Sequence, residues 1–274
     1  MVKFIIVFVL LFTSLQARVN YQHQLDNAIK TIIGENAFAR NKRFIHVIFS
    51  PASRYFKRGR VNSVKVVSTL KANGLVRLIY KKPRTINLTF ITNTNPILFV
   101  KTIEDSLRNI GYYRFVTKDS SYDTSSFSWT ITMQSESIVD PELLQKELVK
   151  RGSYIFAIAR KDPFSWEYKI NTDYVQLDAI KLSTNTIQLK RSMVPYWIDV
   201  KNIFQLSIES QKPNMWHPYL ALYDNNLHLI QVVKKDKITH KLVLRIPKEV
   251  RYLKIADIYM MKNIKAGLHL EATK

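Results

Sequence analysis

The chain contains no cysteine, which excludes a disulfide framework, a thiolate metal site and a cysteine nucleophile. Glycine is also scarce, and the six glycines form neither a G-x-G-x-x-G nor a Walker pattern that would bind phosphate. There is no G-x-S-x-G motif, and the six histidines show no metal-ligand spacing such as H-E-x-x-H. We therefore expect no catalytic residues, no metal and no cofactor, and hence a protein that is not an enzyme.

Two pairs of carboxylates are the remaining candidates for catalysis, since a glycosidase needs two carboxylates that face each other across a cleft. Glu104 and Asp105 lie beside basic residues on one predicted helix, and Asp140 and Glu142 lie at the start of another. Local ion pairs and the helix dipole explain these positions. A hydrolase with an unrecognised carboxylate site is therefore the weakest hypothesis for function.

Only one long apolar run is present, and it lies at the N-terminus. Lys3 precedes the run Phe4 to Phe12, and Thr13-Ser14-Leu15-Gln16-Ala17 follows it. This order is typical of a secretory signal peptide over residues 1–17, with cleavage after Ala17. The apolar run is shorter than the roughly 20 residues that span a bilayer, although an uncleaved signal anchor is the alternative. We expect a periplasmic or secreted protein.

Acidic residues are missing from Ala37 to Ile103, a stretch that holds fourteen Lys and Arg. The whole chain has 42 Lys and Arg against 21 Asp and Glu, a net charge of +21. In an exported protein the accessible counter-charges are lipid headgroups, acidic glycans and acidic protein faces, so nucleic acid is not an expected partner. The candidate binding residues in the densest cluster are Arg54, Lys57, Arg58 and Arg60. The alternative is a solvated basic face that only keeps the protein soluble.

A repeat occurs three times in the first half of the chain. Leu70 and Gly74, Leu107 and Gly111, and Leu148 and Gly152 share one spacing, and Leu78, Phe115 and Phe156 each follow the glycine by four residues. The pattern predicts a helix that ends at glycine and is followed by a strand. Asn95-Pro96 and Asp140-Pro141 predict two helix starts, and Phe-Ser-Trp recurs at 127–129 and 164–166.

We therefore predict an α+β protein with four segments. Residues 1–17 are the signal peptide, 18–84 a basic α/β or helical segment, 85–171 a ferredoxin-like βαββαβ layer with an added strand, and 172–274 a β-sandwich domain. The sandwich is predicted from eight or nine short strand-like runs separated by turn residues such as Asp224-Asn225-Asn226.

Aromatic residues offer a second candidate surface, because sugar rings stack on exposed tryptophan and tyrosine. The candidates are Trp197, Trp216 and Tyr219, and Trp216 stands out because prolines flank its polar loop. Trp129 and Trp166 begin repeated strands and are expected in the core. A Trp216 that folds back onto its own domain is the alternative to an exposed one.

These observations favour a non-enzymatic component of a Gram-negative-type cell envelope that acts through protein interaction, as an accessory to a secretion or motility (flagellar) machine. Its expected partners are envelope proteins or an anionic glycan such as peptidoglycan, with peripheral membrane contact in addition. The second hypothesis is a peptidoglycan- or glycan-binding module.

Overall fold

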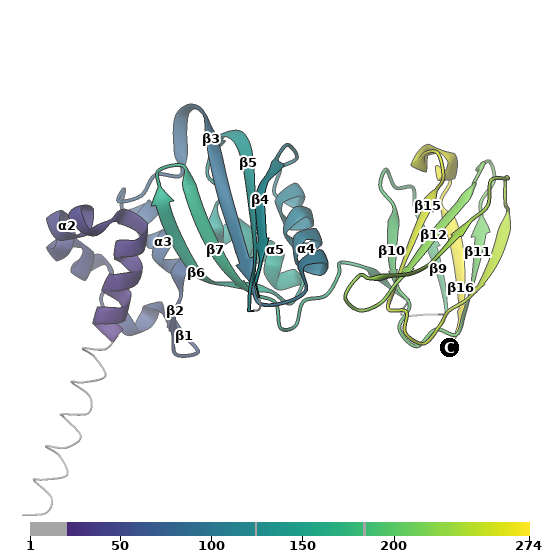
Figure 1. The fold of residues 1–274 in the computed structure, drawn as a ribbon, viewed down its shortest axis with the longest axis horizontal. Coiled ribbons are helices and arrows are strands. Elements are labelled where there is room, and N and C mark those ends of the chain that lie inside the picture. Colours follow the sequence, from purple (N-terminus) through teal and green to yellow (C-terminus); the bar gives the residue numbers. More distant parts are fainter. Residues whose placement is uncertain (1–20, 124, 183–184) are drawn as a thin grey trace, which may run out of the picture. The chain divides into compact units, whose positions relative to one another are not determined.

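The computed structural model describes residues 21–123, 125–182 and 185–274. The predicted signal peptide lies outside these residues. The chain divides into two compact units, Met1–Gln176 and Leu177–Lys274, which are described separately below (Figure 1). Helices and several sheets are both present, so the predicted α+β class is confirmed.

The N-terminal unit begins with two helical segments, residues 21–33 and α2 (Glu35–Ile48). Gly34 joins them with a φ of 82°, a left-handed conformation that glycine adopts at low cost. The apolar residues at helical spacing, Leu25, Ile29 and Ile32, are buried. A short 3-10 helix, η1 (Ala52–Tyr55), and a small hairpin, β1 (Phe56–Lys57) with β2 (Arg60–Val61), follow α2.

Three further helices share one design, which confirms the repeat. They are α3 (Ser63–Ala72), α4 (Pro96–Asn109) and α5 (Pro141–Lys150). Side-chain oxygens of Asn62, Asn95 and Asp140 accept hydrogen bonds from backbone N–H groups at the helix starts. Each helix ends before a glycine of positive φ, and the residue after that glycine donates to the repeated leucine's carbonyl. These bonds join Leu75 to Leu70, Tyr112 to Leu107 and Ser153 to Leu148.

Five other strands of this unit form one sheet of order β4-β5-β3-β7-β6. They are β3 (Ile79–Thr92), β4 (Val116–Tyr122), β5 (Phe127–Ser137), β6 (Tyr154–Asp162) and β7 (Ser165–Asn171). The β3–β7 pair is parallel and the other pairs are antiparallel. Strand β3 runs across residue 84, and the helices 21–72 share one core with the sheet.

The sheet departs from the expected ferredoxin-like order at the added strand. In that layer the strand after the second helix, β6, would pair with β3, whereas here β7 lies between them. Burial explains the arrangement, because Trp166, Tyr168 and Ile170 of β7 are at most 1% exposed and need a central position. The charged end of β6, which includes Lys161 and Asp162, lies at the edge.

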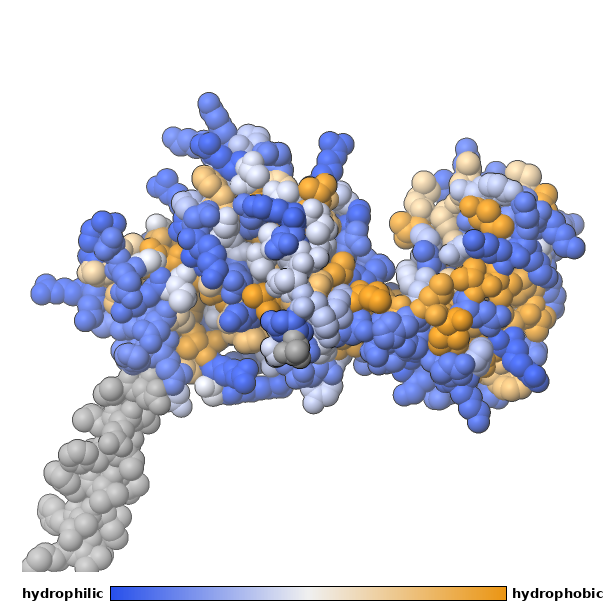
Figure 2. Space-filling model, viewed as in Figure 1, coloured by the Kyte–Doolittle hydropathy of each residue, from blue (hydrophilic) through white to orange (hydrophobic). Residues whose placement is uncertain are grey.

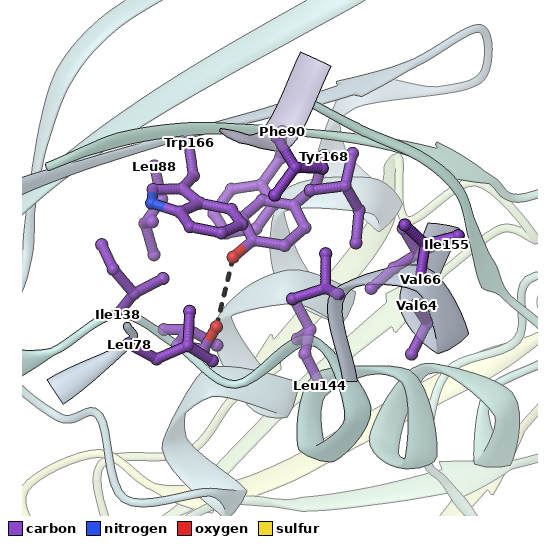
Figure 3. Close-up of a cluster of buried hydrophobic side chains, with 14 of the residues drawn as sticks. Val64, Val66, Leu78, Leu88, Phe90, Ile138, Leu144, Ile155, Trp166 and Tyr168 are labelled. Atoms are coloured by element: carbon purple, nitrogen blue, oxygen red, sulfur yellow. Dashed lines mark hydrogen bonds between the residues drawn. The ribbon is translucent and has the colours of Figure 1, made fainter. Parts of the chain in front are cut away.

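Helices α3, α5 and α4 lie in that order on one face of the sheet (Figure 1). The buried layer between them contains Phe90 and Tyr168, whose rings stack at 5.5 Å, and the hydroxyl of Tyr168 donates to the carbonyl of Val139 at 3.2 Å (Figure 3). Trp129 and Trp166 are buried, as predicted. The opposite face is polar, as the hydrogen bond between the Thr89 and Thr130 hydroxyls illustrates.

The C-terminal unit consists of two sheets that share one buried cluster. The five-stranded sheet has the order β13-β12-β15-β10-β8 and the four-stranded sheet the order β14-β11-β16-β9. Their strands are β8 (Ile180–Lys181), β9 (Thr186–Leu189), β10 (Tyr196–Asp199), β11 (Gln205–Ser210), β12 (Pro218–Tyr223), β13 (Leu229–Lys234), β14 (Lys241–Arg245), β15 (Tyr252–Asp257) and β16 (Leu268–Thr273). A short 3-10 helix, η2 (Met261–Ile264), precedes β16.

Candidate functional site

Trp216 is a core residue and offers no ligand-binding face. Of the two alternatives that the sequence left open, the tryptophan that folds back onto its own unit is the one observed. Its side chain is 0% exposed, and its indole nitrogen donates to the carbonyl of Ala256 at 2.9 Å. Backbone hydrogen bonds from Met215 to Asn263 and from Thr239 to Trp216 hold the loop against the unit. The prolines therefore flank a loop that is hydrogen-bonded to the rest of the unit and whose tryptophan points inward.

Trp197 and Tyr219 lie on the outer face of the five-stranded sheet. Side chains alternate between the two faces of a strand, and the neighbours Ile198 and Leu220 belong to the buried cluster. Tyr223 lies two residues after Ala221 on this same outer face, and its ring centroid is 5.2 Å from that of Trp197. Two of the three aromatic candidates thus lie on one surface.

The register of the strands extends this surface across the sheet. Trp197 of β10 pairs with Lys254 of β15, which pairs with Ala221 of β12, which in turn pairs with Val232 of β13. Paired residues point to the same face, so these four side chains form one row. We call the outer surface formed by Trp197, Tyr219, Tyr223, Lys254 and Val232 the aromatic face.

Strand β13 borders the aromatic face. Among the described residues, no strand pairs with its outer edge, whereas β12 pairs with its inner edge. Leu229, Ile230 and Val232 are 56%, 36% and 36% exposed. An edge strand with exposed apolar side chains and open backbone groups is a template for a further strand. Figure 2 shows apolar side chains at the surface of the C-terminal unit.

Cations lie beside these apolar groups. The Nζ of Lys254 lies 5.9 Å from the ring centroid of Trp197, and that of Lys234 lies 5.2 Å from the ring centroid of Tyr219. Burial among its neighbours raises the pKa of Tyr223, and nearby Tyr219 raises it further, so this phenol is neutral at pH 7. The surface therefore combines aromatic and aliphatic side chains with two cations.

Residues Arg54, Lys57, Arg58 and Arg60 come together at the small hairpin of the N-terminal unit. All four side chains are exposed. They form a second surface, separate from the aromatic face, because the two surfaces belong to different units.

The carboxylate pairs that could have served catalysis have structural partners. Glu104 pairs with Arg108 at 2.9 Å, and Asp105 with Lys101 at 2.5 Å, each on one helix. Burial alone would raise the pKa of Asp140, but the hydrogen bonds from Lys71 and from the backbone N–H of Glu142 bring it below its usual value. An ionised helix cap held in this way is a stabilising group.

Sequence reasoning did not find Tyr223, Lys254 and Val232. The alternation of Leu220 and Leu222 with Tyr219, Ala221 and Tyr223 in β12 is the signal that could have found Tyr223. Lys254 and Val232 join the site only through strand pairing, which leaves no local mark in the sequence.

Among residues 21–123, 125–182 and 185–274, no group of three or more His, Asp or Glu side chains could hold a metal ion. The same part of the chain contains no helix of the length and apolarity needed to cross a membrane. No known protein family matches this chain, and comparison with curated proteins and with solved structures finds no significant match.

Proposed function

We propose that this is an exported binding protein of the cell envelope whose C-terminal unit captures an extended segment of a partner protein. The observation that supports the proposal is the continuity of the exposed edge strand β13 with the aromatic face. A partner strand would hydrogen-bond to the open edge, and its side chains would contact Leu229 and Val232. Lys234 and Lys254 favour a partner segment that carries acidic residues.

A protein partner fits this surface better than a glycan does. Trp197 and Tyr223 contact each other, so each ring covers part of the other's stacking surface. The aliphatic side chains of Leu229 and Val232 provide no hydrogen bonds to sugar hydroxyls, whereas they suit the side chains of an added strand. The glycan-binding hypothesis also loses Trp216, its leading residue, which is buried.

The place of action follows from the N-terminal segment and the charge of the chain, as the sequence indicated. A periplasmic protein with a binding surface and no recognisable catalytic motif suits a structural role, as an accessory to a secretion or motility machine. The two sheets around one core support the interpretation of the C-terminal unit as a β-sandwich that carries this surface.

The test is crosslinking of the protein in its native cells, followed by a salt wash and mass spectrometry of what co-purifies. Val232→Lys places a charge where the partner strand would pack, and we expect it to abolish recovery of a defined envelope protein. The matched control is Val243→Lys, because Val243 is 54% exposed on β14, an edge strand of the other sheet. The control should retain the partner.

Equal recovery of the partner with both variants would rule out β13 as the docking strand. Recovery of wall fragments alone, lost on Trp197→Ala, would instead establish the glycan-binding function. Thermal unfolding of each variant should match that of the parent protein, because both valines are exposed.

A further inference from the structure

The hairpin β1–β2 concentrates positive charge in a very small region. Phe56 pairs with Val61 and Lys57 with Arg60, so Arg58 and Gly59 form the two-residue turn. Both turn residues have positive φ, 51° for Arg58 and 75° for Gly59. Positive φ at both positions is what a type I′ turn requires, and the twist of this turn matches that of the two strands. The chain therefore displays Lys57, Arg58 and Arg60 around one tip. We call these three residues the basic tip.

Within the described part of the chain, no acidic side chain forms an ion pair with the basic tip. Among the residues that the structure describes, neither Arg54 nor any residue of the basic tip forms an ion pair, although many other cations of the chain do. The sequence from Ala37 to Ile103 has no Asp or Glu at all. Exposed like charges at such short spacing repel one another, and an anionic surface relieves that repulsion.

The base of the hairpin is firmly packed, so the backbone that carries the charges is held in place. Tyr55 is buried and lies 4.6 Å from Phe49 between ring centroids. The guanidinium of Arg60 lies 5.8 Å from the ring centroid of Phe156 on β6. A surface presented on a packed base loses little conformational entropy when it binds.

The hairpin also lies where the described chain begins. The ring of Tyr21 is 4.6 Å from that of Phe56, the first residue of β1, between ring centroids. Figure 2 shows mainly hydrophilic residues around this point.

The sequence of the N-terminal segment carries groups that favour an anionic membrane whether or not the segment is cleaved. If the segment is cleaved after Ala17, the new terminal ammonium group and Arg18 lie within three residues of Tyr21, a reach of about 10 Å. If it is retained, the apolar run Phe4 to Phe12 supplies a group that favours the lipid phase. Positive charge or apolar surface is added in either case.

We propose that the basic tip binds the surface of a bilayer that contains anionic phospholipids, with the lipid phosphates as the ligands. The bilayer is the occupant that agrees with the expected export, with the cations of the basic tip and with the apolar run in the N-terminal sequence. Each Lys or Arg close to an anionic bilayer strengthens binding about fivefold, so three together supply about 100-fold. This contact is independent of the aromatic face, and it would hold the protein at the membrane while β13 captures its partner.

The experiment is sedimentation of the purified full-length protein, expressed with its own N-terminal segment, with two kinds of vesicle. One contains phosphatidylcholine alone, and the other also contains about one third phosphatidylglycerol. We expect binding to the anionic vesicles that weakens as salt rises. Replacement of Lys57, Arg58 and Arg60 by Gln should weaken this binding about 100-fold.

Two matched variants keep the result interpretable. Replacement of Arg77, Lys81 and Lys82 by Gln removes the same charge from exposed positions elsewhere in the acid-free stretch, and it should change binding by less than about threefold. The charge-conserving variant Lys57→Arg, Arg58→Lys, Arg60→Lys should bind like the parent. Thermal unfolding of all three variants checks that the unit is folded.

Equal weakening by the two Gln variants would overturn the proposal, since binding would then reflect net charge alone. Equal binding to both kinds of vesicle, or to neither, would overturn it as well. Retention on heparin that depends on the basic tip, without vesicle binding, would overturn the bilayer as the ligand and identify an anionic polysaccharide in its place.

Discussion

The indole nitrogen of Trp216 donates a hydrogen bond to the carbonyl oxygen of Ala256, forty residues later in the chain, at 2.9 Å. This bond joins the loop before β12 to β15. It also gives the buried indole N–H, which belongs to the largest side chain of the C-terminal core, a hydrogen-bond acceptor. The same contact removes Trp216 from the list of ligand-binding residues. Its substitution is therefore a test of stability and not of binding.

Trp216→Ala should destabilise the C-terminal unit by about 4 kcal/mol, because it leaves a large cavity in the core. Trp216→Phe fills most of that space but leaves the Ala256 carbonyl without its donor, so it should cost about 2 kcal/mol. Chemical denaturation followed by circular dichroism measures both. A loss below about 1 kcal/mol for the alanine variant would contradict the buried position.

Glycines of the helix repeat provide a matched pair of substitutions. Gly152 has φ 73°, and a Cβ there would lie 2.1 Å from the carbonyl oxygen of Tyr174, whereas Gly74 has φ 71° and no atom within 4 Å of that position. Gly74→Ala should cost about 1 kcal/mol of backbone strain. Gly152→Ala adds a backbone collision and should cost about 3 kcal/mol or more. Equal unfolding midpoints for the two variants would show that the collision is relieved without cost.

The helices of the repeat could be predicted because their signals are local. Asn95-Pro96, Asp140-Pro141 and the three glycines act on the backbone within a few residues, and the structure places the helix ends there. The position of β7 between β3 and β6 could not be predicted, because strand order depends on contacts between residues about 80 positions apart. Pairings between distant residues leave fewer local signals in the sequence than the starts and ends of helices do.

Two other differences have similar causes. The segment boundary expected between residues 84 and 85 falls inside β3, which continues through it with a shift of register between Ile79 and Arg84. At the aromatic face, Trp197 and Tyr219 could be named from the sequence, but Tyr223, Lys254 and Val232 join them only through pairing across four strands.

Glu147 should make the N-terminal unit sensitive to acid. The hydrogen bond from Lys150, opposed in part by burial and assisted by Asn109 and Arg151, lowers the pKa of Glu147 to about 2. A carboxyl whose pKa is about 4.3 in the unfolded chain and about 2 in the folded one stabilises the fold above the higher value. That contribution is lost as the pH falls from about 5 to about 2.

Glu147→Gln should lower the free energy of unfolding at pH 7 by about 2 kcal/mol, because Arg151 is 3% exposed and its ion pair with the Glu147 carboxylate is lost. The difference in unfolding midpoint between parent and variant should shrink as the pH falls from 5 to 2. Glu142→Gln is the control, since Glu142 is exposed and its loss should have little effect at any pH. A difference that stays constant with pH would contradict the lowered pKa of Glu147.

The contact between Trp197 and Tyr223 decides how the aromatic face is built, and a double-mutant cycle can measure it. The two rings reach towards each other across β15, with their centroids 5.2 Å apart and their planes tilted by 40°. Such pairs are worth about 0.5 to 1.5 kcal/mol beyond the area that they bury. Trp197→Ala, Tyr223→Ala and the double variant should therefore show a coupling energy of about 1 kcal/mol in chemical denaturation.

Coupling near zero would mean that the rings stand apart with their faces available to a sugar, and the glycan-binding hypothesis would regain its strongest support. Coupling of the expected size means that the rings form a closed layer, beside which β13 remains the open part of the surface.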